Sequence, residues 1–290
     1  MTPEELSQAS DTLVLDVRLA DDYEAEHLEG AHNNAVFEVA FNGRMPEIAP
    51  DKNTEVVVYG WNDSSQEAAA AAEKLTRDGY TKVAVLEGGL EGAKAAGLTV
   101  TTGTPVAEDP ATLDGTLNVD TAESRVGWTG RNLLNRHWGE IAIEGGSLNF
   151  AGGKLSSGSI VLDLKQITAT DLAGSDLHDV LIAHLHNDDF FDVGNHPKAT
   201  LEILKAEEVD GPGAPNLVVT ANLTLRGITE EISFTATTGV TPEGKAAAQA
   251  TFSIDRTRWG VLYGSGKFFK RLAGHLVNDQ IEFQLRIITE

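Results

Sequence analysis

The C-terminal part of the chain alternates apolar and polar residues with a period of two, which predicts β-strands with one buried face. The clearest case is residues 216–226, where Leu217, Val219 and Leu223 alternate with other residues. The pattern recurs at Ile160, Leu162 and Leu164, at Leu201 and Ile203, at Ile232, Phe234 and Ala236, at Ala248, Ala250, Phe252 and Ile254, and at Ile281, Phe283, Leu285 and Ile287. Such strands predict an all-β antiparallel barrel or sandwich. A barrel is favoured because closure removes exposed edges.

The first hundred residues follow a different pattern, in which short apolar runs flank a helical segment. The runs lie at residues 13–15, 55–59 and 82–86, and an alanine-rich stretch at residues 66–77 is composed of helix formers. Ser64, three residues before Glu67, fits a capping box at the start of this helix. Continuous apolar strands that alternate with helices predict an α/β domain with a parallel sheet.

Between the two patterns, threonine, proline and acidic residues follow one another without periodicity, which is typical of a linker. We therefore predict a first domain at residues 1–100, a linker at 101–113 and a second domain at 114–290. A chain of 290 residues is long enough for both domains to bury a core.

The composition and net charge of the chain exclude several kinds of site and partner. The chain has no cysteine, so disulfides, thiolate metal sites and cysteine nucleophiles are excluded. Its formal net charge is −22 and both halves contribute to it. A field of that sign repels phosphate backbones and anionic surfaces, so we expect no nucleic-acid partner. The acidic residues are interpreted as a solvated coat.

No stretch is apolar enough to predict a transmembrane helix, and the N-terminal residues lack the basic start and apolar core of a signal peptide. The expected location is therefore the cytoplasm, or the periplasm if a leader has been removed.

Three segments of the first hundred residues together resemble the rhodanese homology family. They are Asp16-Val17-Arg18, residues 26–33, and residues 79–90 with their double-glycine turn. The resemblance implies that a cysteine directly after Tyr59 carries sulfur as a persulfide, held by a loop of backbone N–H groups. Gly60 stands at that position, so this domain is expected to be inactive in sulfur transfer.

The loop that corresponds to the rhodanese active site consists of Gly60, Trp61, Asn62, Asp63, Ser64 and Ser65. Its serines are poor substitutes, because a hydroxyl without a base is a weak nucleophile and forms no persulfide. We expect the domain to act in docking or regulation through a protein partner; the alternative is that the loop still binds a small ligand. Asp16 and Arg18 are interpreted as a structural ion pair and not as a catalytic pair.

Residues 114–290 resemble the YceI-like polyisoprenoid-binding family. The motifs that carry the resemblance are residues 117–128, the Asp-Phe-Phe-Asp run at 189–192 followed by His196-Pro197, residues 223–229, and residues 254–260. The resemblance implies a lipocalin-like eight-stranded barrel that binds a long isoprenoid chain, such as a quinone tail or a polyprenol. It also implies that pairing into a homodimer is common. No catalytic residue, cofactor or metal is expected.

An apolar chain inside such a barrel gains roughly 0.8 kcal/mol for each buried CH₂ group. The predicted lining consists of inward-facing aromatic residues, with His137 placed to meet a polar head group at the mouth. These candidates are Trp128, His137, Phe190, Phe191, Phe234, Phe252, Trp259, Tyr263, Phe268 and Phe269. Alternatively, these side chains fill the core, since aromatic residues dominate cores in general.

Two other functions remain open from the sequence. The histidines at 137, 178, 184, 186 and 196 allow a metal-dependent enzyme, although their spacing fits no familiar zinc motif. A barrel filled by its own side chains would instead be an interaction scaffold.

Overall fold

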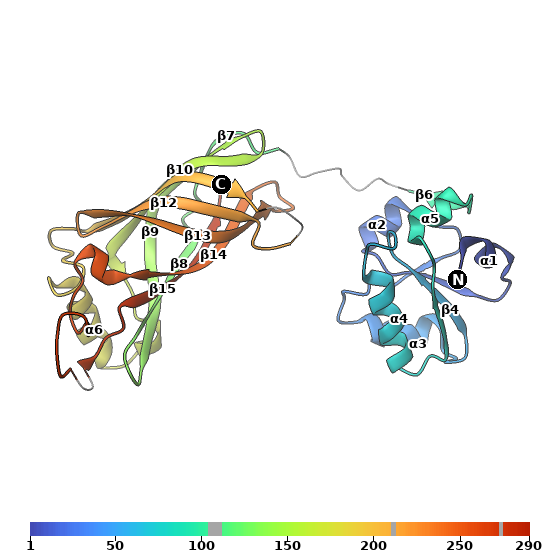
Figure 1. Cartoon of the computed structure of the whole chain (residues 1–290), viewed down its shortest axis with the longest axis horizontal. Coiled ribbons are helices and arrows are strands. Elements are labelled where there is room, and N and C mark those ends of the chain that lie inside the picture. Colours follow the sequence, from blue (N-terminus) through green and yellow to red (C-terminus); the bar gives the residue numbers. More distant parts are fainter. Residues whose placement is uncertain (104–111, 210–212, 273–274) are drawn as a thin grey trace. The chain divides into compact units, whose positions relative to one another are not determined.

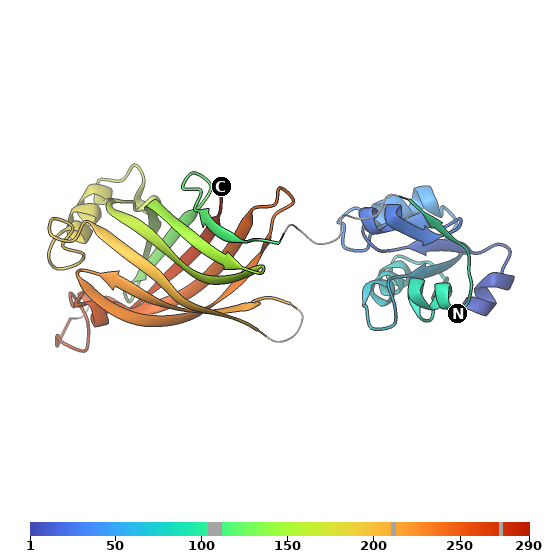
Figure 2. The ribbon, with the colours of Figure 1, turned by 90° about the horizontal axis from the view of Figure 1, so that it is seen from above.

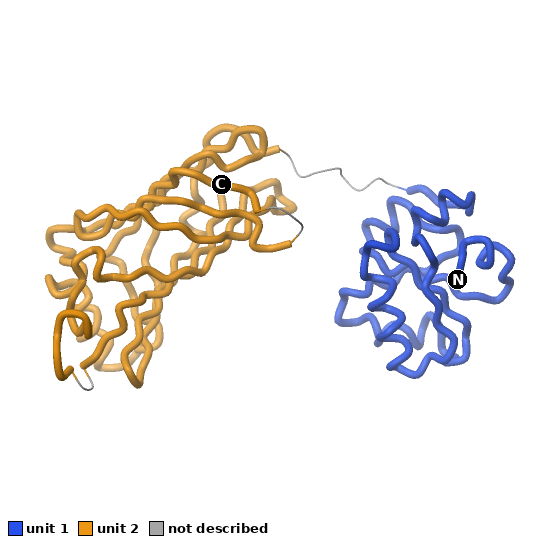
Figure 3. Tube along the Cα trace, in the orientation of Figure 1, with its two compact units in different colours: residues 1–108 blue, residues 109–290 orange. Residues whose placement is uncertain are grey.

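A computed structural model describes residues 1–103, 112–209, 213–272 and 275–290. The chain divides into two compact units, which Figure 3 distinguishes by colour. Among the described residues, no helix is both long enough and apolar enough to cross a membrane.

The N-terminal unit is a parallel sheet with helices on both faces. Its strand order is β3-β1-β4-β5, and a short antiparallel pair, β2-β6, lies beside it (Figure 1). The strands are β1 (Leu13–Asp16), β2 (Glu26–Leu28), β3 (His32–Asn33), β4 (Glu55–Tyr59), β5 (Lys82–Val85) and β6 (Val100–Thr102), and the helices are α1 (Pro3–Gln8), α2 (Ala20–Ala25), α3 (Phe41–Ile48), α4 (Glu67–Arg77) and α5 (Gly89–Ala95).

The continuous apolar run of β4 is explained by burial on both faces. Val56 and Val58 belong to one core with residues of α3 and α4, whereas Val57 and Tyr59 belong to a second core with residues of α1 and α5. The predicted parallel α/β domain is therefore confirmed, with its three apolar runs as adjacent strands.

The C-terminal unit is a closed eight-stranded antiparallel barrel, formed by β8 to β15, which Figure 2 shows along its side. Closure occurs at β9, which pairs with both β8 and β10, while the short β7 adds to one end of β9. The strands are β7 (Gly115–Asn118), β8 (Arg125–Arg131), β9 (Arg136–Ala151), β10 (Lys154–Ile167), β11 (Lys198–Glu208), β12 (Leu217–Leu225), β13 (Ile228–Val240), β14 (Ala246–Asp255) and β15 (Gln280–Ile288).

The period-two pattern marks the barrel interior. All of the odd-numbered residues of β12, from Leu217 to Leu225, are buried, and those between them are partly exposed. Among the described residues, the helices of this unit are α6 (Leu177–His186) and two single-turn helices, η1 (Thr170–Leu172) and η2 (Arg256–Trp259). Helix α6 covers one end of the barrel (Figure 1), which we call the α6 end.

Three local features differ from the sequence prediction. Helix α4 has no side-chain cap, because the Ser64 hydroxyl donates to Asn62 Oδ1 instead. The first unit extends past residue 100, since β6 pairs with β2 up to Thr102. The rest of the predicted linker lies largely at residues 104–111, outside the described residues. Helix α6 was not predicted.

Candidate functional site

The barrel is hollow at its α6 end, where a cavity of about 270 Å³, here called the first chamber, opens between the strands and α6. Most of its lining is apolar and comes from β8, β9, β12, β14, β15, α6 and the segments around them. The apolar lining residues are Trp128, Ile141, Leu181, Leu185, Phe190, Phe191, Leu225, Ile254, Val261, Tyr263, Val277, Ile281 and Phe283. The predicted hollow interior is therefore present at this end, and a completely filled barrel is not.

Trp128 is held in the wall of the first chamber by the segment that follows β10. Its indole Nε1 donates to the Thr168 carbonyl oxygen over 2.9 Å. Gly139 on β9 allows this segment to lie against the strand, because a Cβ atom at position 139 would be 1.9 Å from the same carbonyl oxygen. The close approach therefore requires glycine at position 139.

The rim of the first chamber carries a polar pair, formed by His137 of β9 and Asp171 of the same segment. His137 Nδ1 lies 2.8 Å from Asp171 Oδ2, and the Trp138 N–H donates to Asp171 Oδ1. Burial works to raise the pKa of Asp171, but the hydrogen bonds from Trp138 and His137 outweigh it and hold this pKa below its ordinary value. The pair fixes the ring of His137 at the mouth, where it can meet a polar group of a guest.

A second polar group at the mouth, His184, is embedded among aromatic rings. Its imidazole meets Phe190 edge-on at 4.7 Å and Tyr263 at 4.6 Å between ring centroids. Phe190 is in turn positioned by Arg226, whose Nη1 donates to the Phe190 carbonyl oxygen. The chamber thus combines an apolar body with histidines at its rim, which suits a chain with a polar head.

A row of stacked rings on the neighbouring strands β13, β14 and β15 lies between the first chamber and a cavity toward the opposite end. Phe252 on β14 stacks on Phe234 at 4.3 Å and on Phe283 at 5.8 Å between centroids. Phe283 lines the first chamber, whereas Phe234 lines a different cavity on the far side. We call these three phenylalanines the aromatic partition.

Beyond the aromatic partition, the opposite end of the barrel contains a second chamber. It consists of adjoining cavities of about 290 Å³ and about 50 Å³, which share Leu148, Leu155 and Leu217. At its mouth, Lys154 Nζ donates to Glu208 Oε2 over 2.7 Å, and Asn216 pairs with the backbone of Thr238. The polar groups at this mouth are therefore engaged with each other.

The histidines do not assemble a metal site in the part of the chain that the structure describes. No group of three or more histidine, aspartate or glutamate side chains is placed there to hold an ion.

In the N-terminal unit, the loop that follows β4 is occupied by its own side chains. A Cβ atom on Gly60 would lie 3.0 Å from Glu67 Oε2 and 3.3 Å from Ser65 Oγ. The space into which a side chain at position 60 would point is therefore taken by a carboxylate at the start of α4. An anion is disfavoured at this position by charge repulsion.

The remaining residues of this loop are also engaged. Asp63 Oδ1 accepts the Gly88 N–H over 2.7 Å, and the Ser65 hydroxyl donates to the Asn62 carbonyl oxygen. Trp61 stacks over the guanidinium of Arg18, which lies 4.3 Å from the ring centroid. The loop is thus held by contacts among its own residues and with Gly88 and Arg18.

Asp16 and Arg18 form the structural ion pair expected from the sequence. Arg18 Nη2 lies 2.7 Å from Asp16 Oδ2, and both side chains are fully buried. Burial works to lower the pKa of Arg18, but the hydrogen bond and charge of Asp16 outweigh it and raise this pKa. The same Nη2 donates to the Glu26 carbonyl oxygen, so the pair ties β1 to β2.

The YceI-like domain family matches residues 117–288, the whole of the barrel and more than half of the chain. The chain belongs to the YceI-like domain family. A rhodanese-like domain matches residues 2–96. Both resemblances inferred from the sequence motifs are therefore confirmed.

Solved structures similar to the YceI-like barrel include BcnA from Burkholderia cenocepacia, with 19% identity, a TM-score of 0.49, and 59% of this chain and 99% of that chain covered. Another is a polyisoprenoid binding domain from Saccharophagus degradans, with 13% identity, a TM-score of 0.45, and 61% and 99% covered. For the rhodanese-like unit, the thiosulfate sulfurtransferase PspE of Escherichia coli is 38% identical over 69 residues, which are 24% of this chain and 62% of that protein. The chain thus spans less than two thirds of that relative.

The first chamber of the YceI-like barrel brings together part of the predicted ligand-binding set. Trp128, His137, Phe190, Phe191 and Tyr263 line it. Phe234 and Phe252 lie deeper, in the aromatic partition. Trp259 lies outside the chamber, where it is fully buried and its Nε1 donates to the Leu223 carbonyl oxygen.

For Phe268 and Phe269 the prediction of inward-facing rings is wrong. Their side chains are 55% and 47% exposed. Both N–H groups donate to the Ser265 carbonyl oxygen, so the two residues lie on a tight turn with exposed side chains.

Several lining residues of the YceI-like barrel were not predicted as ligand contacts. Leu181, His184 and Leu185 come from α6, and their spacing of three and four residues is the signal that identifies one face of a helix. Arg131 is the last residue of β8, Asn132 follows it, and His275 lies in the segment before β15; the sequence contains no comparable signal for these three.

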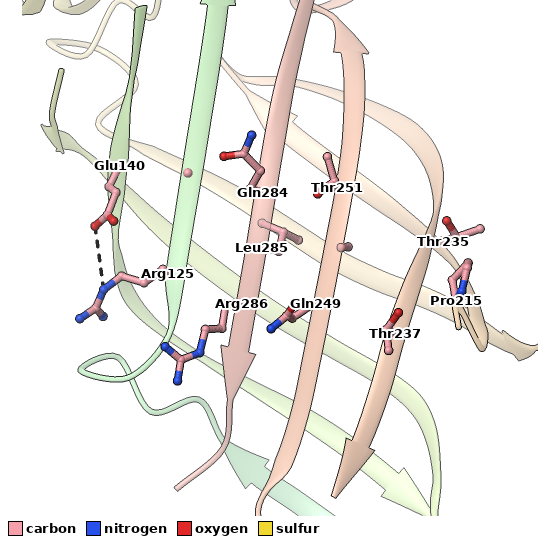
Figure 4. Close-up of a pocket in the computed structure, with 12 residues that line it drawn as sticks. Arg125, Glu140, Pro215, Thr235, Thr237, Gln249, Thr251, Gln284, Leu285 and Arg286 are labelled. Carbon is pink, nitrogen blue, oxygen red and sulfur yellow. Dashed lines mark ion pairs between the residues drawn. The ribbon is translucent and has the colours of Figure 1, made fainter. Parts of the chain in front are cut away.

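The outer face of the YceI-like barrel carries a shallow polar recess of about 560 Å³. In Figure 4, Gln284, Gln249 and Thr251 stand on neighbouring strands there, and Arg125 pairs with Glu140 over 3.9 Å. Gly127 leaves the recess open, since a Cβ atom there would touch the Gln284 side chain. These residues are the polar half of the strand alternation and are separate from the first chamber.

Proposed function

We propose that the barrel binds an isoprenoid or a similar apolar chain in the first chamber, with a polar head at the histidine rim. The observation that carries this proposal is the cavity of about 270 Å³ with its mainly apolar lining. Membership of the YceI-like domain family supports a ligand-binding role for the barrel. A binding site of this kind needs no catalytic residue, because the burial of apolar surface supplies the affinity.

The dimensions of the first chamber favour a short chain. Pockets for drug-sized ligands usually span about 300–1,000 Å³, so a cavity of this size holds a small guest or one segment of a larger one. The aromatic partition stands at its inner end. We therefore propose a chain shorter than the long isoprenoid that the family resemblance implies.

The rim favours a neutral or weakly polar head group. His137 and His184 present ring nitrogens near the mouth, and Asn132 and Arg131 add hydrogen-bond donors. A hydroxyl or a quinone carbonyl would find partners there, while the tail contacts Ile281, Leu185 and Trp128.

The test is to extract the purified chain with organic solvent for mass spectrometry, and then to titrate the emptied chain with geraniol while tryptophan fluorescence is monitored. Ile281→Phe fills the chamber and is expected to weaken geraniol binding at least about tenfold, equivalent to about 1.4 kcal/mol. Leu204→Phe is the matched control, because Leu204 is exposed on β11.

The carrier proposal is overturned if extracts contain no apolar molecule and geraniol fails to bind. Equal affinity in the Ile281→Phe variant and the wild type would also reject the first chamber as its location.

For the rhodanese-like unit we propose a non-catalytic role in docking or regulation through a protein partner. Support comes from Gly60 at the position of the nucleophile and from the Glu67 carboxylate beside it. The full chain is expected to show no transfer of sulfur from thiosulfate to cyanide, and Gly60→Cys is expected to form no persulfide by mass spectrometry. A persulfide on this variant would show that the loop still supports the chemistry.

A further inference from the structure

Large apolar side chains are exposed around the mouth of the first chamber. Leu133 and Leu134 form the tip of the β8–β9 hairpin and are 69% and 84% exposed. Phe268 and Phe269 form the tip of the loop that follows η2. The two segments lie side by side, since Asn132 forms a β-bridge with Val277 and the Asn278 N–H donates to the Arg131 carbonyl oxygen. We call them the two apolar tips. Leu177 and Val180 on α6 add exposed apolar surface at the same end.

The two apolar tips carry basic residues in a strongly acidic chain. Arg131 and Arg136 flank the hairpin tip, and Lys270 and Arg271 follow the two phenylalanines. Arg131 is engaged by Glu282. In the described segments, Arg136, Lys270 and Arg271 have no ion-pair partner, and Arg136 stacks on Trp138 at 4.5 Å. Positive charge therefore borders the two apolar tips.

We propose that the two apolar tips dock on an anionic lipid bilayer and bring the mouth of the first chamber to its surface. Apolar side chains on a basic background insert at the boundary of head groups and acyl chains. Basic residues near an anionic leaflet strengthen binding by about fivefold each. The net charge of −22 acts weakly at this surface, because charges beyond about 8 Å are screened at physiological salt.

Acidic residues of α6 oppose this docking and limit its strength. Asp176 and Asp179 lie beside Leu177 and Val180, so α6 faces an anionic surface less favourably than the two apolar tips do. We therefore expect reversible, salt-sensitive binding, which suits a carrier that must leave the bilayer again. A lipid surface is favoured over a protein partner because basic residues border the exposed apolar side chains of both tips.

This docking rests on the proposed carrier function, because it would let a guest pass between the bilayer and the first chamber. Binding of the chain to vesicles is nevertheless measured without any guest. The full chain is sedimented with phosphatidylcholine vesicles that contain or lack phosphatidylserine. We expect binding only to the anionic vesicles, and weaker binding at high salt. Phe268→Ser with Phe269→Ser is expected to reduce it at least about tenfold, while Leu204→Ser, an exposed leucine on β11, leaves it unchanged.

Two further measurements distinguish a failure of the docking proposal from a failure of the carrier proposal. Lys270→Glu with Arg271→Glu is expected to abolish the preference for anionic vesicles. Geraniol binding in solution is expected to be the same in the Phe268→Ser, Phe269→Ser variant and the wild type, so loss of the carrier function would be detected separately. The docking is overturned if the wild type ignores anionic vesicles, or if the tip variants bind them as well as the wild type. The docking is also overturned if the tip substitutions abolish binding of a protein partner but leave binding to anionic vesicles unchanged.

Discussion

The two ends of the barrel differ in how their polar groups are used. At the α6 end, His137 and His184 stand at the mouth of the first chamber, and basic and apolar tips project around it. At the opposite end, Lys154 pairs with Glu208, and Asn216 pairs with the backbone of Thr238. Both chambers are apolar inside.

Since the main cavities at the two ends have similar volumes, about 270 Å³ and about 290 Å³, the chemistry of the mouth is a better guide to function than the size of the cavity. Lys154 and Glu208 use their charged groups on each other, which leaves little for a guest. In the described residues His137 bonds to Asp171 through Nδ1 alone, so its Nε2 is still available to a guest. The α6 end is therefore the end at which we expect a head group, and the following changes test the difference.

Removal of the aromatic partition should have the largest effect. Phe252→Ala is expected to cost about 3 kcal/mol of unfolding free energy, because it leaves a cavity. It should also join the two chambers, so that affinity continues to rise from geraniol to longer prenols. Urea denaturation and a titration series of prenols measure both effects. Phe150→Ala, at the opposite end, is the control and should leave the dependence on chain length unchanged.

Substitution of His184 should have the next largest effect, a loss of geraniol affinity at the α6 end. Loss of its edge-on contacts with Phe190 and Tyr263 is expected to weaken geraniol binding about tenfold in His184→Ala. His178→Ala is the control on the same helix. Equal titration curves for the two variants would contradict a role for His184 at the mouth.

The pair of Asp171 and His137 should make the free energy of unfolding depend on pH in the acid range. Because folding lowers the pKa of Asp171, its carboxylate stabilises the fold above the unfolded pKa of about 3.9, and this contribution disappears as the pH falls. Asp171→Asn is expected to lose about 1 kcal/mol at pH 7. The difference from the wild type should shrink in urea denaturation below about pH 4, and a difference that persists there would refute this cause.

The ion pair at the opposite end should matter least. Lys154 and Glu208 are 67% and 61% exposed, so Lys154→Ala is expected to change the unfolding free energy by less than about 0.5 kcal/mol. Geraniol binding should not change. A clear loss of geraniol affinity would show that the guest binds at this end and not at the α6 end.

The repeating patterns of the sequence predicted most of the fold. The alternation at residues 217–225 identified a barrel strand, and the apolar run at 55–59 identified a strand buried on both faces. Trp128 and Phe191 were predicted as ligand contacts from the family motifs that contain them, and both line the chamber.

The remaining parts of the site depend on long-range contacts that no local pattern encodes. Phe268 is as apolar as Phe252, yet the turn at Ser265 directs it outward, whereas strand pairing directs Phe252 inward. The aromatic partition likewise arises because Phe252 and Phe283 are directly opposite one another in the register of β14 and β15. A register is a property of two strands together.

Gly139 gives the rim a fixed dimension. Any side chain at this position would collide with the Thr168 carbonyl oxygen, so the segment that carries Asp171 would have to move outward. An alanine there would act as a one-methyl spacer between the strand and that segment. Position 139 is therefore the place to widen the mouth of the first chamber for a bulkier guest, since a single added methyl group displaces the segment that forms its rim.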